Sequence, residues 1–314
     1  MDLMIAPNSV PFSGADTAPV TGTPQWATEG NPAAGIAATN LRAYQINALM
    51  AEITAVIAAA GFPLDRMNNA QLLAALLRSS PLVEQERGFR GSAPGGAKTA
   101  SFTASKVMLQ TVAGLTIKIA GGTFAFNGAT TGAGGMDTGT TPTSADLHIY
   151  AIYNPTTNTV STLGTIAGAG ADIYPNALPA GYTASALICS CKTDGGGNIL
   201  QFVQMGRSIK ISGVIALTAG TATVLTALSI ASIVPVNAKS VSGNLCSGTA
   251  TANQVTVAST ASPGMGAFVS ASGSSAQIIS AFPGVYMVTA QTIYYYITVA
   301  SVTGMYIQIE EYSI

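Results

Sequence analysis

The sequence feature that most constrains this chain is the near absence of charge after Lys210. From there to Ile314, the residue types Lys, Arg, His, Asp and Glu occur only as Lys239, Glu310 and Glu311. A soluble monomer usually covers its surface with interleaved charges of both signs, and a long uncharged stretch favours association instead. We therefore expect this region to be partly buried between identical chains, with a threefold assembly as the working hypothesis.

Composition narrows the fold class further. The chain has 314 residues, of which 34 are Gly and 15 are Pro, so many turns joining short strands are expected. Its 12 basic and 13 acidic residues give a formal net charge of -1, and no Lys/Arg stripe is present. The chain therefore lacks the electrostatic footprint of a nucleic-acid-binding protein, and we expect no nucleic-acid partner.

Three cysteines and the amino terminus give little sign of chemistry or export. Cys189 and Cys191 fall on one face of a predicted strand, so their thiols point the same way without disulfide geometry, and Cys246 makes the set odd. We interpret all three as small buried apolar residues. Residues 1–14 lack the basic segment and continuous apolar core of a secretory signal, so we expect the protein to be made and assembled in a cytoplasm.

The first region, residues 1–38, is predicted to be an extended anchoring arm. Its five prolines exclude a continuous helix or a central strand. The single Trp of the chain, Trp26, lies between Pro24 and Pro32. Two interpretations stay open: the indole covers helices of its own chain, or it anchors the arm on another protein, where a rigid aromatic group contributes most to docking.

Residues 39–80 are predicted to form an αα-hairpin. Thr39 or Asn40 is the expected N-cap of a helix over residues 41–60, and Gly61 is expected to end it. Asn68 or Asn69 is the expected cap of a second helix that is rich in Leu.

The first helix carries a short heptad pattern, formed by Ile46, Met50, Ile53 and Ile57. Spacings of four and three residues are typical both of a trimer seam and of an ordinary amphipathic face. Two heptads are too short to separate these interpretations or to hold an oligomer alone.

The rest of the chain is predicted to be β. Residues 81–100 are rich in Gly and charge and are interpreted as a linker. Residues 101–210 form the predicted middle β domain, with period-two apolar patterns such as Leu147-Ile149-Ala151 and turn sequences at residues 154–158 and 194–198. Residues 211–314 form the predicted C-terminal β tip domain. Both β domains are expected to be sandwich-like.

The sequence gives no support for catalysis, a cofactor or a metal. Glycoside hydrolysis needs a pair of carboxyl groups facing each other, and no spacing nominates a pair. The single His148 alternates with Leu147 and Ile149, so it is expected to face solvent or a subunit boundary, and no nucleophile motif accompanies it. Residues 132–137 are glycine-rich but lack the signatures of phosphate and calcium loops, which favours a flexible loop. The acidic residues of the β regions are Asp137, Asp146, Asp172, Asp194, Glu310 and Glu311.

Three groups of residues resemble the tail fibres and baseplate-attached tail proteins of bacteriophages. The groups are residues 16–78 with Trp26 and Gly30-Asn31-Pro32, residues 181–204 with Lys192-Thr193-Asp194-Gly195, and residues 291–295 with the closing Tyr312-Ser313-Ile314. The resemblance implies an elongated homotrimeric structural protein of the virion tail, attached to tail or baseplate proteins through its N-terminal arm.

Three functions stay open under this resemblance. In the first, the C-terminal domain of a tail fibre binds a host surface glycan or outer-membrane protein. In the second, the chain is an adaptor between the tail and a separate receptor-binding protein. In the third, it degrades capsule with a site shared between chains. Flat amphipathic rings suit sugar stacking and also a trimer core; the candidates are Tyr294, Tyr295, Tyr296, Tyr306 and Tyr312.

Overall fold

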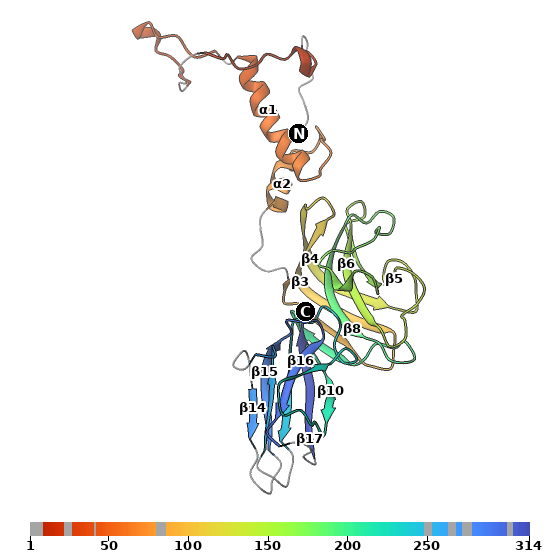
Figure 1. Cartoon of the computed structure of the whole chain (residues 1–314). Helices are drawn as coiled ribbons and strands as arrows, with labels where there is room; N and C mark the ends of the chain where they lie inside the picture. The colour runs from red at the N-terminus through yellow and green to blue at the C-terminus, as the bar shows by residue number, and fades with distance from the viewer. Residues whose placement is uncertain are drawn as a thin grey trace. The chain divides into compact units, whose positions relative to one another are not determined.

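The computed structural model describes residues 9–21, 27–40, 42–79, 86–247, 253–262, 268–271, 278–299 and 304–314. The chain divides into two compact units, Met1–Pro81 and Leu82–Ile314. The described helices α1 and α2 lie in the first unit and the strands in the second (Figure 1). The prediction of a mainly β chain with a small N-terminal helical hairpin is confirmed.

The described part of the predicted arm contains two single 3-10 turns, Phe12–Gly14 and Pro32–Ala34. The second turn lies in a small closed loop, in which Asn31 and Ile36 exchange two backbone hydrogen bonds of 2.8 and 3.0 Å. Gly35 closes the turn at φ 68°, in the left-handed region that glycine adopts without a steric penalty.

Helix α1 (Ala43–Ala59) begins later than predicted, and its N-cap is Arg42. The Arg42 N–H donates to Oε1 of Gln45 at 2.9 Å, so a side chain within the first turn satisfies the cap. The predicted caps were wrong because the Thr39 hydroxyl accepts from the Thr28 N–H instead, at 3.0 Å. Gly61 ends the helix as predicted, with φ 76°.

Helix α2 (Gln71–Ser79) packs on the C-terminal half of α1. Ile57, Ala60 and Ala75 form the buried centre of this hairpin. The buried Gln71 fixes the connecting loop, because its Nε2 donates to the Pro63 carbonyl at 2.6 Å and its Oε1 accepts from the Asp65 N–H at 3.0 Å. Since α1 has 17 residues and α2 has 9, α2 leaves the first turns of α1 without a helical partner in the described part of the chain.

The second unit has two lobes (Figure 1). The middle lobe contains β1 (Glu86–Arg87), β2 (Arg90–Ala93), β3 (Thr99–Thr111), β4 (Thr116–Asn127), β5 (Gly135–Met136), β6 (Asp146–Asn154), β7 (Thr159–Thr165), β8 (Ala184–Lys192) and β9 (Phe202–Met205). The C-terminal lobe contains β10 (Ser208–Thr218), β11 (Thr226–Ser229), β12 (Ser240–Ser247), β13 (Gln254–Ala258), β14 (Phe268–Ala271), β15 (Ile279–Tyr286), β16 (Thr292–Ile297) and β17 (Met305–Ser313).

One sheet runs through both lobes. Among the described residues it has 13 strands, in the order β15-β12-β17-β10-β9-β2-β3-β8-β6-β7-β5, with β1 and β4 also paired to β3. The remaining strands form a second sheet in the order β11-β16-β13-β14. The predicted domain boundary at residue 210 falls inside β10, which pairs with β9 on one side and β17 on the other.

The inner faces of both lobes share one apolar core. A single cluster of buried side chains extends from Phe89 in the middle lobe to Ile314 at the chain end. In the C-terminal lobe the core lies between the two sheets, because Val257 of β13 and Ile307 of β17 both belong to it. This lobe therefore has two layers, whose inward and outward side chains alternate along each strand.

Strands β1 and β2 lie in the segment that composition assigned to a linker. Phe89 and Ala93 are buried, while Arg90 and Ser92 between them are exposed. The ring of Phe89 stacks on Phe102 with 5.8 Å between centroids. The high Gly content hid this alternation, because Gly91 occupies an inward position without contributing an apolar side chain.

The predicted turns of the middle lobe are confirmed. Asn158, at φ 53°, joins β6 to β7. In the turn after β8, Oδ1 of Asp194 accepts from the backbone N–H groups of Gly196 and Asn198, both at 2.8 Å. Hydrogen bonds from the Asn198 side chain and backbone lower the pKa of Asp194, which accounts for this carboxylate without a catalytic role.

We predict that Phe102→Ala lowers the free energy of unfolding by about 3–5 kcal/mol, because Phe102 is fully buried between the rings of Phe89 and Phe202. Val203→Ala, at an exposed position of β9, is the control and is expected to change it by about 0.5 kcal/mol or less. Urea unfolding followed by circular dichroism measures both. Equal losses for the two variants would contradict the described core.

Candidate functional site

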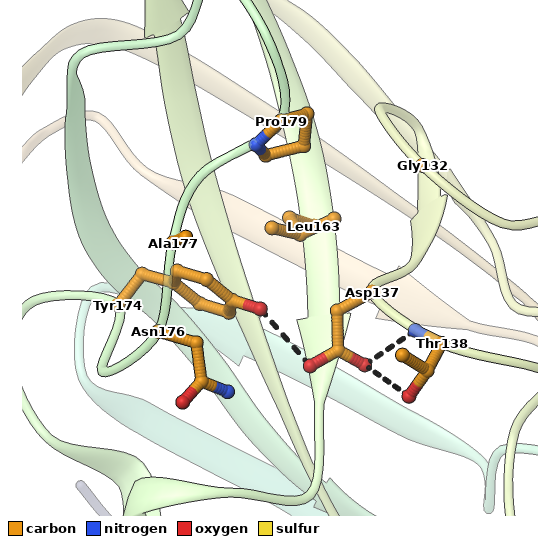
Figure 2. Close-up of a pocket in the computed structure, with 8 residues that line it drawn as sticks. All are labelled: Gly132, Asp137, Thr138, Leu163, Tyr174, Asn176, Ala177 and Pro179. Carbon is orange, nitrogen blue, oxygen red and sulfur yellow. Dashed lines mark hydrogen bonds between the residues drawn. The ribbon is translucent and has the colours of Figure 1, made fainter.

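A pocket of about 370 Å³ opens in the middle lobe (Figure 2). It lies between the loop around β5, the buried strand β7 and the loop that leads to β8. Its lining combines apolar groups with a small set of polar ones: Gly132, Asp137, Thr138, Leu163, Tyr174, Asn176, Ala177 and Pro179. The pocket is a half-open depression, and its volume lies near the lower end of the range for small-molecule sites in proteins.

Asp137 is the polar centre of the pocket. Its Oδ2 accepts from the Tyr174 hydroxyl at 3.0 Å, and its Oδ1 accepts from the Thr138 N–H at 2.7 Å and the Thr138 hydroxyl at 3.3 Å (Figure 2). It is the sole carboxylate among the lining residues. Glycoside cleavage ordinarily uses a pair of carboxyl groups, and this lining presents one.

Tyr174 is held rigidly beside Asp137. Its side chain is 6% exposed, and its ring meets that of Tyr150 edge-on with 5.5 Å between centroids. Burial, followed by the hydrogen bond to Asp137, raises the pKa of Tyr174 to about 12, although a hydrogen bond from Asn176 acts in the opposite direction. The phenol is therefore a neutral hydrogen-bond donor at ordinary pH.

Glycines shape the loop that carries Asp137. Gly132 and Gly134 have φ of 93° and 91°, and the Gly134 N–H donates to the Thr162 carbonyl at 2.7 Å. A Cβ on Gly135 would lie 2.2 Å from the Thr130 carbonyl oxygen. The predicted flexible loop is thus bonded to its neighbouring strand. The sequence does not reveal the pocket, because Asp137 meets a tyrosine 37 residues away.

The five tyrosines predicted as receptor or trimer-core contacts do not share one face. Tyr295 and Tyr312 are buried within the single chain, whereas Tyr294 and Tyr296 are half-buried on the opposite face of β16 and Tyr306 is half-buried on β17. The alternation of a strand explains this division, since consecutive residues point to opposite faces. Tyr294 and Tyr296 are neighbours on one face, so they are the pair best placed for an external contact.

The predicted trimer seam is divided by α2. Ile57 is buried and Ile53 packs beside it in the hairpin core, while Ile46 and Met50 are half-buried near the start of α1. Among the predicted anchoring residues, Pro32 lies exposed at the first position of its 3-10 turn. Pro24 and Trp26 lie outside the described residues.

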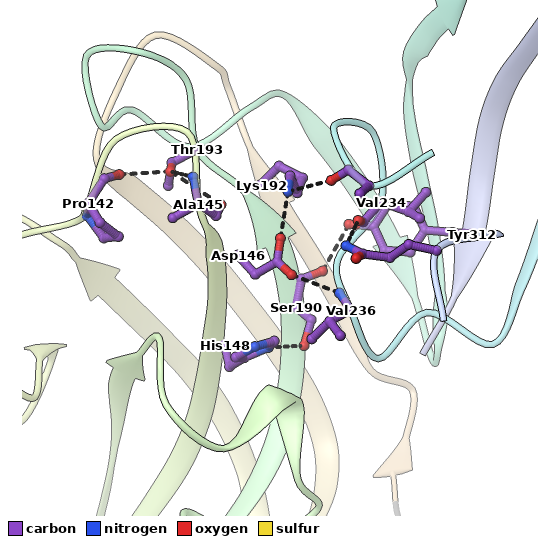
Figure 3. Close-up of polar contacts among 12 residues, drawn as sticks. Pro142, Ala145, Asp146, His148, Ser190, Lys192, Thr193, Val234, Val236 and Tyr312 are labelled. Carbon is purple, nitrogen blue, oxygen red and sulfur yellow. Dashed lines mark hydrogen bonds and ion pairs between the residues drawn. The ribbon is translucent and has the colours of Figure 1, made fainter. Parts of the chain in front are cut away.

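An ion pair within the middle lobe, between β6 and β8, lies at the junction with the C-terminal lobe (Figure 3). Lys192 Nζ lies 2.6 Å from Asp146 Oδ1, and both side chains are largely buried. Each partner also bonds to the loop between β11 and β12 of the C-terminal lobe: Lys192 donates to the Ala231 carbonyl, and Asp146 accepts from the Val236 N–H, both at 2.8 Å. The pair therefore fixes β6 and β8 to residues 231–236.

Ser190 links further groups at this junction. Its hydroxyl lies 2.9 Å from Nδ1 of His148 and accepts from Nδ2 of Asn237 at 3.0 Å, and its carbonyl accepts from the Tyr312 hydroxyl at 2.8 Å (Figure 3). The prediction that His148 faces solvent or a subunit boundary was wrong, because this side chain is buried within the single chain. His148 is 1% exposed because β6 is covered on both faces, and this burial lowers its pKa despite the nearby Asp146.

Cys189, Cys191 and Cys246 are buried thiols that form no disulfide, as predicted. In the part of the chain that the structure describes, no group of three His, Cys, Asp or Glu side chains is arranged to hold a metal ion. The described helices include none whose length and apolar character would let it cross a bilayer.

Comparisons with known proteins give no relative. No protein-family model matches the chain, and neither a curated protein nor a solved structure matches it.

We predict that the free energy of unfolding falls as the pH rises from 10 toward about 12, in part because of Tyr174. Its pKa lies near 10 in the unfolded chain and is raised to about 12 in the folded one. Above pH 10 the unfolded chain loses this proton while the folded chain retains it, so stability is full below pH 10 and declines through this window.

Tyr174→Phe removes this contribution and is expected to flatten the decline, as measured by urea unfolding between pH 9 and pH 12, a window set by the two pKa values. Tyr306→Phe is the control, at a half-buried tyrosine away from the pocket. The same slope for Tyr174→Phe and the unaltered chain would argue against a protonated, buried phenol.

Proposed function

We propose that this chain is a structural subunit of a homotrimeric bacteriophage tail fibre. In this proposal its N-terminal arm attaches to tail or baseplate proteins, and its C-terminal lobe is presented to a host surface glycan or outer-membrane protein. The resemblance in the sequence suggests the virion role. The observation that carries the self-assembly is an unprotected sheet edge on β10.

Strand β10 has two different halves. Residues 208–210 pair with both β9 and β17, and Ile211 pairs with β9. From Val214 to Thr218 the described pairs are with β17 alone. Val214 and Ile215, on this second half, are 39% and 51% exposed. A strand edge with apolar, β-branched side chains is a template for pairing with another chain.

Proteins normally blunt such edges with charge or proline. The opposite edge of the same sheet follows this rule, because β15 contains Pro283, which has no N–H to donate. Between Ile211 and Thr218, by contrast, β10 contains neither a charged residue nor a proline. This difference supports a second copy of the chain as the natural cover of the β10 edge.

Helix α1 also supports association between chains, because it has little charge and exposes apolar side chains. Glu52 is its only charged residue. Leu49 is 58% exposed, beside the half-buried Ile46 and Met50. A helix that is apolar on nearly every side is normally buried. These three residues support a seam between chains, while Ile53 and Ile57 already serve the hairpin.

The charges of the C-terminal lobe gather where it meets the middle lobe. Lys210 and Glu311 lie 3.9 Å apart, and Lys239 precedes the residue that pairs with Ser313. Residues 240–309 contain no Lys, Arg, His, Asp or Glu. The described residues of this range therefore offer uncharged hydroxyl, amide, aromatic and aliphatic groups, Tyr294 and Tyr296 among them, to a host surface.

We predict that the full-length chain sediments as a trimer at micromolar concentration and that Ile215→Lys shifts it toward monomer. A lysine buried without a partner at an interface costs about 3 kcal/mol or more, which weakens association by roughly 100-fold. Val224→Lys, at an exposed position between β10 and β11, is the control and should leave the trimer intact. A well-behaved monomer for the unaltered chain would refute the assembly.

The alternative role is an adaptor between the tail and a separate receptor-binding protein. Electron microscopy of intact particles labelled at Ile314 separates the two roles. We predict a label at the free end of an appendage, as expected of a host-binding tip. A label covered by, or joined to, a further tail protein would instead establish the adaptor.

A further inference from the structure

We propose that the pocket beside Tyr174 binds a neutral pyranose sugar. The pocket lies in the middle lobe, far along the chain from the C-terminal residues assigned to host contact in the preceding proposal. It is lined by residues of one chain, so the inference stands whether or not the chain forms a trimer.

Charge narrows the ligand class first. The lining contains no Lys, Arg or His, so nothing in it compensates a phosphate, sulfate or uronic acid carboxylate. Its one formal charge is Asp137, which already accepts three hydrogen bonds from Thr138 and Tyr174. These donors disperse the negative charge and reduce its attraction for a cation. A neutral ligand is therefore favoured over an anion or an amine.

The remaining hydrogen-bonding capacity suits a hydroxyl group. The two oxygens of an ionised carboxylate offer about four acceptor positions, and three are occupied in Asp137. A ligand hydroxyl that donates to the fourth position makes a charge-assisted hydrogen bond, which is stronger than a neutral one. The exposed amide of Asn176 at the pocket rim adds a second polar group for a neighbouring hydroxyl.

The rest of the lining suits the carbon side of a sugar ring. Leu163 lies at the back of the pocket, and Ala177 and Pro179 lie along one side (Figure 2). A pyranose presents C–H groups on its faces and hydroxyl groups around its edge, so it needs an apolar surface next to a polar one. The exposed Ala177 and the half-buried Pro179 provide that apolar surface, while Leu163 is fully buried and only closes the back of the pocket.

The site is preformed, because hydrogen bonds to neighbouring strands hold its polar residues in place. The Asp137 N–H donates to the Gly164 carbonyl of β7 at 2.8 Å, and the Tyr174 N–H donates to the Ser185 hydroxyl of β8 at 2.9 Å. Both polar residues are thus fixed to strands of the sheet. A site that needs little ordering on binding retains more of its interaction energy as affinity.

Saturation-transfer NMR on the full-length protein tests the proposal, with the methyl glycosides of glucose, galactose and mannose as neutral probes at millimolar concentration. Glucuronic acid and glucosamine are the anionic and cationic probes. We expect saturation of at least one neutral glycoside and a weaker response from both charged sugars.

Three variants locate the binding. Asp137→Asn keeps the shape of the side chain but replaces an acceptor oxygen by a donor, and it should weaken binding about tenfold or more. Ala177→Trp fills the pocket without removing a described hydrogen bond and should abolish binding. Asp172→Asn is the matched control, because this carboxylate is exposed in the same loop region and does not line the pocket. It should bind as the unaltered chain does.

The outcomes are distinct for correctly folded protein, as checked by circular dichroism. The proposal is overturned if no neutral glycoside is saturated, or if glucosamine alone is saturated. It is also overturned if Asp137→Asn and Ala177→Trp both bind the neutral glycosides as well as the unaltered chain does. Sedimentation of the same samples measures trimer formation independently of sugar binding. Failure of the trimer proposal and failure of the sugar-binding proposal can therefore be told apart.

Discussion

The structure of the β unit depends on the divided pairing of β10. Its first residues bond to β9 and so continue the middle-lobe sheet, while pairs at both of its ends bond to β17 and so start the C-terminal lobe. Because one backbone ladder crosses between the lobes, a single core can form beneath both of them. The same arrangement leaves the second half of β10 without a described strand partner on one side, so the element that unites the lobes also carries the edge that we propose to pair with another copy.

Polar side chains at the lobe junction supply geometry more than net stability. A largely buried ion pair such as Asp146–Lys192 gains little over an apolar pair, because removing both charges from water offsets their attraction. It does require specific partners, and here the partners are backbone groups of the loop at residues 231–236. Tyr312, near the end of β17, adds a third contact between the lobes, because its hydroxyl donates to the Ser190 carbonyl. Together these groups select one docking of the lobes among the many that an apolar contact alone would permit.

Local sequence rules predicted the features that depend on neighbouring residues. The mainly β class, the end of α1 at Gly61 and the turns at Asn158 and Asp194 follow from apolar periodicity and turn chemistry. The features that were missed depend on distant residues. His148 is buried because other segments cover β6, and Asp137 becomes part of a pocket only when Tyr174 is brought to it. A short stretch of sequence around His148 or Asp137 does not contain the distant residues that cover the one or contact the other.

The charged residues of the C-terminal lobe lie near its junction with the middle lobe, and residues 240–309 have none, so salt and pH should affect its outer surface little. Attraction between formal charges weakens with ionic strength, over a Debye length of about 8 Å at physiological salt. A surface without carboxylates, amines or imidazoles has no such attraction to lose and no group that titrates near neutrality. Binding to that surface should therefore depend little on salt concentration and little on pH in the mildly acidic range.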